Sequence, residues 1–405
     1  MQRSLVGSEM CIRDSSYSIL SFFLLLLPTG QASANNNDSI RLSLLTCAPG
    51  EEIYSLFGHT AIRYENSSQG IDVVFNYGLF SFNTPNFIFR FSLGETDYQL
   101  GATDYERFAA EYAFFGRSVW QQTLNLTDEE KTELIRLLQE NYRPENRVYR
   151  YNFFYDNCAT RPRDKIEESI AGKVIYPAEP QDGSLTFRDI VHQYCKGHPW
   201  ARFGIDLCIG SEADQPITQR QMMFAPFYLM DAFDGAQIKG DSIQRPLITA
   251  NELIVDATPE PDESDWMPTP LQCSLLLFIL TAAATIYGIR RRTGLWGIDL
   301  FLFGIAGIVG CVLAFLALFS QHPAVSSNFL LLVFHPGQLL FLPYIIYCVR
   351  KGKKCWYLTL NLAVLTLFIV LFPVIPQRFD FAVVPLALVL LIRSASNLIV
   401  TSKKK

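Results

Sequence analysis

Two short stretches of the sequence hold residue types that can carry out covalent catalysis. The first, YSLFGHTAIRY, places His59 directly after Gly58 at the start of a β-rich run. The second, YRYNFFYDNCATRPRDKIEES, places Cys158 at the start of a helical pattern that has Pro162 in its first turn. A cysteine becomes a nucleophile when it loses its proton, and a histidine can accept that proton. The two stretches therefore predict a nucleophilic cysteine with a histidine as its base.

The position of Cys158 favours the thiolate form. Unpaired backbone amides and the helix dipole stabilise negative charge at a helix N-terminus, and Arg161 and Arg163 add positive charge nearby. Two plainer interpretations remain open: a histidine at a strand start is usually structural, and Cys158 can form a disulfide with Cys47.

The segments around these residues predict an α+β domain between Ser39 and about residue 250. TAIRY and DVVFNYG are β-rich and are separated by ENSSQGI, whose residues suit a turn, so we expect a hairpin that begins at His59. In LTDEEKTELIRLLQENY, Thr127 and Glu130 form a capping box before a helical apolar spacing.

The C-terminal part of the chain has the composition of a membrane protein. Hydrophobic residues make up 49% of the chain and charged residues only 18%, and the apolar excess follows Pro270. Apolar runs at 271–289, 295–320, 329–349, 356–375 and 380–398 are each near the length that crosses a bilayer. We therefore predict about five spans in an all-α region over 271–400, preceded by a linker at 251–270.

The charges between these runs predict the orientation. Basic clusters at 290–292, 350–354 and 403–405 fall on one side, whereas QHPAVSSN and PQRFD fall on the other. The positive-inside rule makes the basic side cytoplasmic, so the N-terminal domain lies outside the cytoplasm.

A signal peptide at 16–34 gives the same topology. An apolar stretch from Ile19 to Leu27 precedes the small-residue triplet 32–34, which is typical of a cleavage site. Residues 1–15 have neither an amphipathic period nor an apolar run, and we expect them to be a non-native lead. Because export leads to an oxidising compartment, Cys195 and Cys208 are candidates for a disulfide within 35–250.

Other classes of function have little support. The net charge of -5 is spread without a basic stripe, so we expect no nucleic-acid partner. Metal-ligand spacing is also lacking, and we predict neither a metal nor a cofactor.

The order of these motifs is similar to the permuted papain-like fold of the lecithin:retinol acyltransferase family, whose members form acyl-cysteine intermediates from phospholipids. The glycine-histidine strand comes first, a polar residue follows on the next strand, and Asn157-Cys158 comes much later. The resemblance implies that His59 is the general base, Asn76 in FNYG orients its imidazole, and Cys158 is the nucleophile. Asp72 is the rival for the orienting role.

A closer resemblance covers nearly the whole mature chain. TCAPGEEIYSLFGHTAIR, NYGLFSFNTPNF, NLTDEE, ENRVYRYNFFYDNCATRPRD and HPAVSSNFLLLVFHP together resemble the Lnb-type lipoprotein N-acyltransferases. This resemblance implies an enzyme of the inner membrane that has a catalytic domain in the periplasm. The membrane motif departs from the family pattern, because Val333 and His335-Pro336 stand where a tryptophan and Asn-Pro are usual.

The resemblance also implies the partners: a phospholipid acyl donor and a lipoprotein whose lipidated N-terminal cysteine accepts the acyl group. Five further residues are candidates for substrate-binding or supporting roles: Asn157, Arg161, Arg63, Tyr155 and, in the outward membrane loop, His322. Phenylalanines between Phe80 and Phe91 can line an acyl groove, dip into lipid, or form an ordinary core.

Two rival functions remain at this point. In a Cys-His hydrolase acting on lipids or peptidoglycan amides, water replaces the amine in the second step. A non-catalytic assembly factor or sensor would tolerate the loss of Cys158.

Overall fold

The computed structural model describes residues 39–83, 85–177, 185–240, 244–257 and 267–402. The expected lead at 1–15 and the signal peptide at 16–34 lie outside these residues. The chain divides into two compact units. The first comprises 1–183 and 218–261, and the second comprises 184–217 and 262–405.

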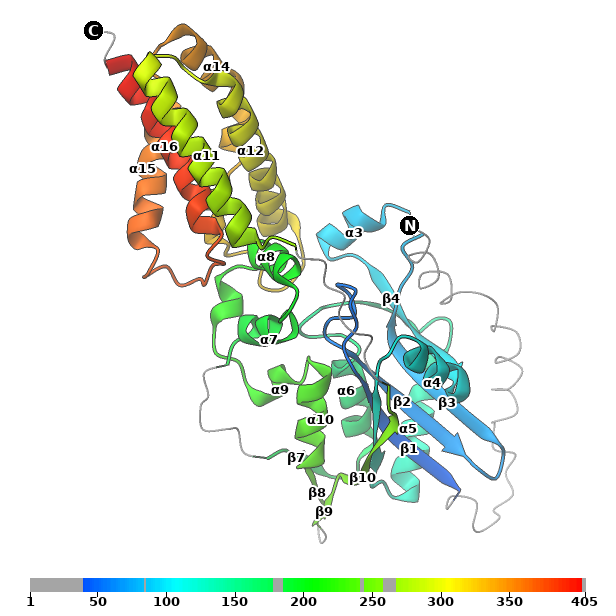
Figure 1. Ribbon diagram of the computed structural model, residues 1–405. Coiled ribbons are helices and arrows are strands. Elements are labelled where there is room, and N and C mark those ends of the chain that lie inside the picture. The colour runs from blue at the N-terminus through cyan, green and yellow to red at the C-terminus, as the bar shows by residue number, and fades with distance from the viewer. Residues whose placement is uncertain (1–38, 84, 178–184, 241–243, 258–266, 403–405) are drawn as a thin grey trace. The chain divides into compact units, whose positions relative to one another are not determined.

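A seven-stranded antiparallel sheet forms the centre of the first unit (Figure 1). Its strands, in spatial order, are β10 (Ile248–Val255), β5 (Val119–Leu124), β1 (Ile40–Cys47), β2 (His59–Asn66), β3 (Ile71–Leu79), β4 (Asp97–Asp104) and β6 (Val148–Arg150). A smaller sheet pairs β7 (Lys173–Ile175), β8 (Gln237–Lys239) and β9 (Gln244–Pro246). Together with the helices around it, this sheet makes the first unit the expected α+β domain.

The large sheet buries apolar side chains on both faces, because alternate residues of a strand point to opposite sides. Leu44, Ile62 and Phe75 belong to a core that also includes residues of α5 (Asp128–Tyr142), α6 (Thr160–Ser169) and α10 (Pro226–Asp234). Leu45 and Ala61 belong to a second core, with residues of α4 (Tyr105–Phe114). The two cores fix the sheet from both sides.

Two local predictions are confirmed. Strands β2 and β3 form the expected hairpin, in which Ala61 lies opposite Asn76. Helix α5 begins after Thr127, whose side chain accepts a hydrogen bond from the Glu130 amide while the Glu130 carboxylate accepts one from the Thr127 amide. Both features depend on residues close in sequence.

The first unit differs in extent from the expected 35–250. Strand β10 runs to Val255 and pairs with β5, so its last five residues occupy the start of the expected linker. Residues 184–217 belong instead to the second unit, where they form α7 (Phe187–Tyr194), α8 (Pro199–Cys208) and the 3-10 helix η2 (Ser211–Asp214).

Helices occupy each of the five apolar runs in the second unit. They are α11 (Pro270–Arg291), α12 (Trp296–Phe319), the short elements η3 (Phe329–Leu332) and α13 (Gly337–Leu340) followed by α14 (Leu342–Lys351), α15 (Trp356–Leu371), and α16 (Val383–Ser402). Among the described residues, three helices are long and apolar enough to cross a membrane. The third run is bent by 74° where α14 begins, and counting it as one span gives four. Helix α15 is a shorter apolar helix of 16 residues. The expected number of about five spans is reached only if α15 and the bent run are each counted as one span.

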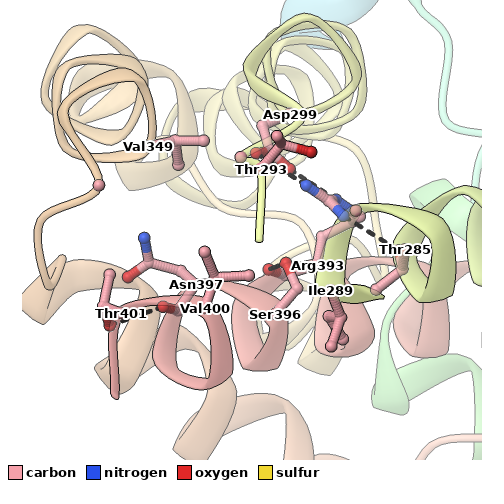
Figure 2. A pocket seen from close by; sticks show the side chains of 13 residues that line it. Thr285, Ile289, Thr293, Asp299, Val349, Arg393, Ser396, Asn397, Val400 and Thr401 are labelled. Carbon is pink, nitrogen blue, oxygen red and sulfur yellow. Dashed lines mark hydrogen bonds and ion pairs between the residues drawn. The ribbon is translucent and has the colours of Figure 1, made fainter. Parts of the chain in front are cut away.

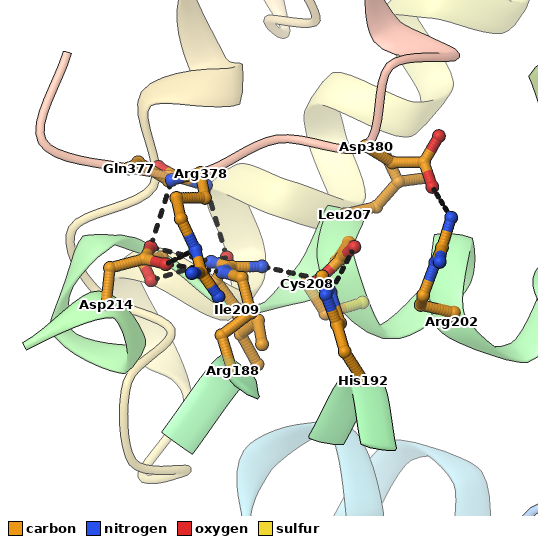
Figure 3. A network of polar contacts seen from close by, with 12 residues as sticks. Arg188, His192, Arg202, Leu207, Cys208, Ile209, Asp214, Gln377, Arg378 and Asp380 are labelled. Carbon is orange, nitrogen blue, oxygen red and sulfur yellow. Dashed lines mark hydrogen bonds and ion pairs between the residues drawn. The ribbon is translucent and has the colours of Figure 1, made fainter. Parts of the chain in front are cut away.

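A buried polar network fixes residues 184–217 within the second unit (Figure 3). The fully buried Arg188 of α7 donates to Asp206 of α8 at 2.6 Å and to Asp214 of η2 at 2.8 Å. Its remaining hydrogen bonds go to the carbonyls of Ile209 and Gly210. The network continues into both loops that were predicted to face outward.

Backbone and side-chain contacts join this segment to the two outward loops. The Gly210 amide donates to the Ala324 carbonyl at 2.6 Å. Gln377 donates to the Ile209 carbonyl at 3.2 Å, and Arg378 pairs with Asp189. The exported segment thus meets the loops 321–328 and 376–380 within one compact unit, in agreement with the predicted topology.

The expected disulfide between Cys195 and Cys208 is absent, because both cysteines are free. Helices α7 and α8 are joined instead by ion pairs. Asp206 contacts both Arg188 and the imidazole Nε2 of His192 at 2.9 Å. Ion pairs thus join the two helices in place of the disulfide that the sequence suggested.

Candidate active site

The Cys158 sulfur lies beside the first peptide of strand β2. It accepts hydrogen bonds from the backbone amides of Thr60 and of Cys158 itself. Thr60 directly follows His59, so residues about a hundred positions apart in sequence meet at one end of the sheet. Both His59 and Cys158 retain some solvent-accessible surface, which leaves the pair open to a substrate.

Asn76 fixes the orientation of the His59 ring. The distance from His59 Nε2 to Asn76 Oδ1 is 3.3 Å, and the Asn76 amide nitrogen donates to the Val74 carbonyl. Because that nitrogen is already used, Oδ1 accepts from Nε2–H, and the free lone pair of the imidazole is on Nδ1. The rival residue Asp72 is engaged elsewhere, since both of its oxygens accept hydrogen bonds from Arg63.

The resting charge of the pair differs from the sequence-based expectation. Burial raises the pKa of the Cys158 thiol to about 11, although the two backbone amides act in the opposite direction. Burial, with the positive charge of Arg117, lowers the pKa of His59 to about 4. The expected thiolate is therefore wrong for the resting site, where desolvation outweighs the helix N-terminus and both groups are neutral.

Cys47 lies next to this pair. It is opposite His59 in the β1–β2 ladder and is completely buried. Burial raises its pKa to about 12, while a hydrogen bond with Tyr112 acts in the opposite direction. Cys47 and Cys158 are both free, so the alternative disulfide between them is absent.

Asn157 and Arg161 both make contacts close to Cys158. The Asn157 Oδ1 accepts hydrogen bonds from the amides of Ala159 and Thr160, and its Nδ2 donates to the carbonyls of Phe153 and Phe224. The side chain therefore satisfies amides at the start of α6 and anchors the turn. Its observed contacts are structural.

Arg161 acts on a neighbouring tyrosine. It forms a bidentate ion pair with Asp156, at 2.6 and 2.7 Å. Its guanidinium lies 3.5 Å from the centre of the Tyr149 ring. Arg161 thus holds Tyr149 against the site through a cation–π contact.

The other supporting candidates are Arg63, Tyr155 and His322. Arg63 points to Asp72 and stacks over Tyr105 at 3.4 Å, further along β2. Tyr155 is half exposed on the turn before Cys158. His322 belongs to an outward loop of the second unit.

Three buried hydroxyls on β1, β2 and β6 were not identified from the sequence. The hydroxyls of Thr46, Thr60 and Tyr149 have no hydrogen-bond partner among the described residues. Thr46 and Thr60 are opposite each other on β1 and β2. Since buried polar groups are normally paired, such atoms mark a place where a substrate or water can bind.

Gly78 brings Tyr149 close to Cys158. With φ of 95°, it adopts a conformation that favours glycine, and a Cβ built there would lie 3.4 Å from Cys158 Cβ and 3.9 Å from the Tyr149 hydroxyl. The glycine in FNYG was visible in the sequence, but the tyrosine that it approaches comes about seventy residues later. Only the pairing of β4 with β6 places Tyr149 there.

A polar cavity in the helical bundle has different chemistry (Figure 2). Arg393 of α16 forms a bidentate ion pair with Asp299 of α12, at 2.7 and 3.0 Å, and donates to Thr285 of α11. The cavity is also lined by Gly352 and Thr293, beside the basic clusters that were predicted to be cytoplasmic. Its charges are paired with each other, and it holds neither cysteine nor histidine.

A metal centre has no support in the described part of the chain, where no cluster of three histidine, cysteine or acidic residues is suitable for a metal ion.

Comparisons with known proteins identify both units. Residues 30–192 match the family model of the Lnb N-terminal periplasmic domain, and residues 262–405 match that of the Lnb transmembrane domain. No curated protein and no solved structure matches the chain, so the resemblance to a permuted papain-like fold stays a prediction. Together the two family models cover about three quarters of the sequence in the expected order. The chain therefore belongs to the Lnb family, with a periplasmic N-terminal domain followed by a transmembrane domain.

Proposed function

We propose that this protein is a cysteine-dependent lipoprotein N-acyltransferase of the inner membrane. It moves a fatty acyl group from a phospholipid, through a thioester on Cys158, to the α-amino group of a lipoprotein's lipidated N-terminal cysteine. The observation that carries the proposal is the contact of the Cys158 sulfur with the amide of Thr60, the residue that follows His59, whose imidazole is held by Asn76. Membership of the Lnb family supports the substrate class.

In the first step, the neutral pair reacts as Cys158 attacks the ester carbonyl of the phospholipid. His59 Nδ1 takes the thiol proton while the C–S bond forms. The ester C–O bond then breaks, and the same proton passes to the departing lysophospholipid oxygen. Because both groups are neutral at rest, proton transfer accompanies attack, and no preformed ion pair is required.

In the second step, the lipoprotein amine attacks the thioester. An N-terminal amine has a reference pKa of roughly 8, so part of it is in the neutral, nucleophilic form at neutral pH. This neutral amine attacks, His59 accepts a proton from its nitrogen as the C–N bond forms, and the proton passes to the sulfur as the C–S bond breaks, which returns the thiol. One histidine thus serves both halves of the reaction.

The negative oxygen that develops in each step needs hydrogen-bond donors. The Tyr149 hydroxyl is buried near Cys158 and has no partner within the described ranges, so it can donate to this oxygen. The backbone amide of Cys158, which is directed at the sulfur in the resting site, can turn to this oxygen as a second donor. Donors aimed at developing charge are usually a large contribution to catalysis.

Mass spectrometry of lipoprotein N-termini tests the proposal directly. We expect triacylated termini in cells in which this protein is the one N-acyltransferase, and diacylated termini with free amines when Cys158→Ser replaces it. Cys47→Ser is the matched control, because it removes the neighbouring thiol and leaves the nucleophile in place. Triacylation that persists in Cys158→Ser would refute the mechanism.

Trapping the intermediate tests the chemistry separately. Purified full-length protein incubated with phospholipid should gain the mass of an acyl group on the peptide that contains Cys158. An acyl group that transfers to water but not to a lipoprotein amine would instead identify a hydrolase. A protein that never becomes acylated would be a non-catalytic factor.

A further inference from the structure

The short helix α3 (Phe87–Leu93) is an unusual surface feature of the first unit. Its sequence, FIFRFSL, is largely apolar, and none of its residues is buried. Ile88 is 80% exposed, Phe89 58% and Phe91 46%. A helix of a soluble domain normally buries its apolar face, whereas α3 leaves large apolar side chains exposed.

The backbone on both sides holds α3 in this position. Asn86 and Gly94 flank the helix, and both have left-handed conformations, with φ of 56° and 72°. The Glu95 amide donates to the Arg90 carbonyl and closes the turn after the helix. The exposure of α3 therefore follows from a defined local structure.

The single charge of the helix is directed back toward the sheet. The Arg90 guanidinium donates to Asp97 of β4 at 2.6 Å and to the Glu95 carbonyl at 3.0 Å. With this charge paired, the exposed side chains Ile88, Phe89 and Phe91 form an apolar surface.

Neighbouring aromatic residues extend this surface. Phe82, which is half exposed, contacts Phe87 with ring centroids 5.1 Å apart. Tyr54 is also exposed and lies 6.2 Å from Phe82. We call the residues Ile88, Phe89, Phe91, Phe82 and Tyr54 the α3 patch.

A series of aromatic contacts connects the α3 patch to the nucleophile. Phe80 stacks on Phe87 at 5.7 Å and contacts Tyr98 at 5.0 Å. Tyr98 in turn stacks on Tyr151 at 4.1 Å. The phenol groups of both tyrosines are close enough to interact electrostatically with the Cys158 thiol. A series of aromatic contacts thus leads from α3 to two tyrosines that interact with the Cys158 thiol.

We propose that the α3 patch enters the outer leaflet of the membrane that holds the same chain, and that it guides the acyl chain of the donor lipid along the aromatic contacts to Cys158. The second half of this proposal rests on the proposed function, whereas the membrane contact does not. A bilayer is the occupant that the chain itself supplies, because it carries helices of membrane-spanning length. Aromatic and aliphatic side chains without net charge suit the boundary between headgroups and acyl chains.

Site-specific photo-crosslinking tests the membrane contact without requiring activity. Full-length protein is reconstituted into vesicles of phosphatidylethanolamine and phosphatidylglycerol with Ile88→p-benzoylphenylalanine. We expect phospholipid adducts at this position, as at the positive control Ile279→p-benzoylphenylalanine on α11. The exposed Arg136 of α5, replaced in the same way, should give none. Absence of lipid adducts at position 88, or crosslinks there to a second protein copy, would overturn the proposal.

The rate of Cys158 acylation tests the guidance of the donor. Replacing two large apolar side chains, in Ile88→Ser with Phe89→Ser, should slow acylation by bilayer phospholipid at least ~10-fold, because such side chains partition strongly into lipid. Acylation by a monomeric short-chain phospholipid in water should be unchanged. Phe114→Ser, at an exposed phenylalanine that contacts Phe115 at the end of α4, is the matched control.

The outcomes separate the two proposals. If the double variant acylated Cys158 at the wild-type rate with both donors, or lost rate equally with both, a role for the α3 patch in reaching bilayer lipid would be excluded. Lipid adducts at position 88 without any acyl-Cys158 would refute the proposed function and support the membrane contact. Acyl-Cys158 without lipid adducts at position 88 would support the proposed function and refute the membrane contact.

Discussion

The Cys158 region and the Arg188 region both bury polar groups, but they satisfy them differently. Around Arg188, the guanidinium donates to two carboxylates and two carbonyls, and Asp206 also contacts His192. Around Cys158, the hydroxyls of Thr46, Thr60 and Tyr149 lack partners in the part of the chain that the structure describes. Unpaired buried groups reduce stability, and such groups can be satisfied by a bound substrate or by water.

This contrast separates catalysis from architecture. Changes around Cys158 should alter reaction rates while leaving the fold intact, and changes around Arg188 should do the opposite. Five experiments test this division, beginning with the largest expected effect.

Loss of the base should have the largest effect. His59→Ala should slow acylation of Cys158 by roughly 10²–10⁴-fold, the usual contribution of a general base. Stopped-flow or quenched-flow mass spectrometry of the acyl-enzyme measures this rate. His198→Ala, in the second unit, should leave the rate unchanged.

The orienting role of Asn76 predicts a smaller loss. Asn76→Ala keeps the base but releases its ring, and misplaced catalytic groups cost on the order of 10²-fold. If His59→Ala retained the wild-type rate, His59 would be a structural histidine and the division between the two regions would fail.

Loss of the Tyr149 hydroxyl should lower kcat by about 10²–10³-fold with little change in KM, because an oxyanion donor acts mainly in the transition state. Tyr149→Phe is compared with Tyr64→Phe, which removes a buried hydroxyl that accepts a hydrogen bond from Asn66. Steady-state kinetics with a soluble ester measures both variants. An equal rise in KM for both substitutions would indicate a packing effect.

The pH dependence of acylation reports the resting charge of the pair. With a His59 pKa of about 4, the imidazole is already neutral at pH 5 and accepts protons throughout the range above. The rate with a soluble ester should therefore be constant from pH 5 to 8. It should fall about tenfold per pH unit only below about 4, where the base becomes protonated. A fall that begins between pH 6 and 7 would show that the histidine titrates normally.

Disrupting the paired region should affect stability with little effect on chemistry. Arg188→Met leaves Asp206 and Asp214 buried without their cation, which costs about 3–5 kcal/mol. We expect a lower melting temperature and unchanged acylation per folded molecule. Arg136→Met removes an exposed ion pair with Glu133 and should shift stability by no more than about 1 kcal/mol. A large loss of the acylation rate in folded Arg188→Met protein would contradict the division between the two regions.

The sequence predicted features that depend on neighbouring residues or on strong composition. The β2–β3 hairpin and the capped helix α5 are confirmed because a turn and a capping box act over a few residues. The membrane segments were visible from apolar length, although the bend before α14 and the shortness of α15 were not. The candidate catalytic residues, His59 and Cys158, were also recognisable by their types.

Features that depend on burial or on distant pairing could not be predicted. The direction of the Cys158 pKa shift is set by the protein packed around the sulfur, which no local motif encodes. Tyr149 reaches the site only through the register of β4 and β6. The disulfide expected for Cys195 was wrong, since the partners of α7 and α8 include loop residues more than a hundred positions later.

The division of the chain also has a consequence for biogenesis. Residues 184–217 are synthesised before the loops that complete their network, including Gln377 and Arg378. This segment can reach its final packing only after nearly the whole polypeptide has been translated and inserted. A secreted fragment that ends before residue 262 would lack those partners, so stability measured on such a fragment would understate that of the intact protein.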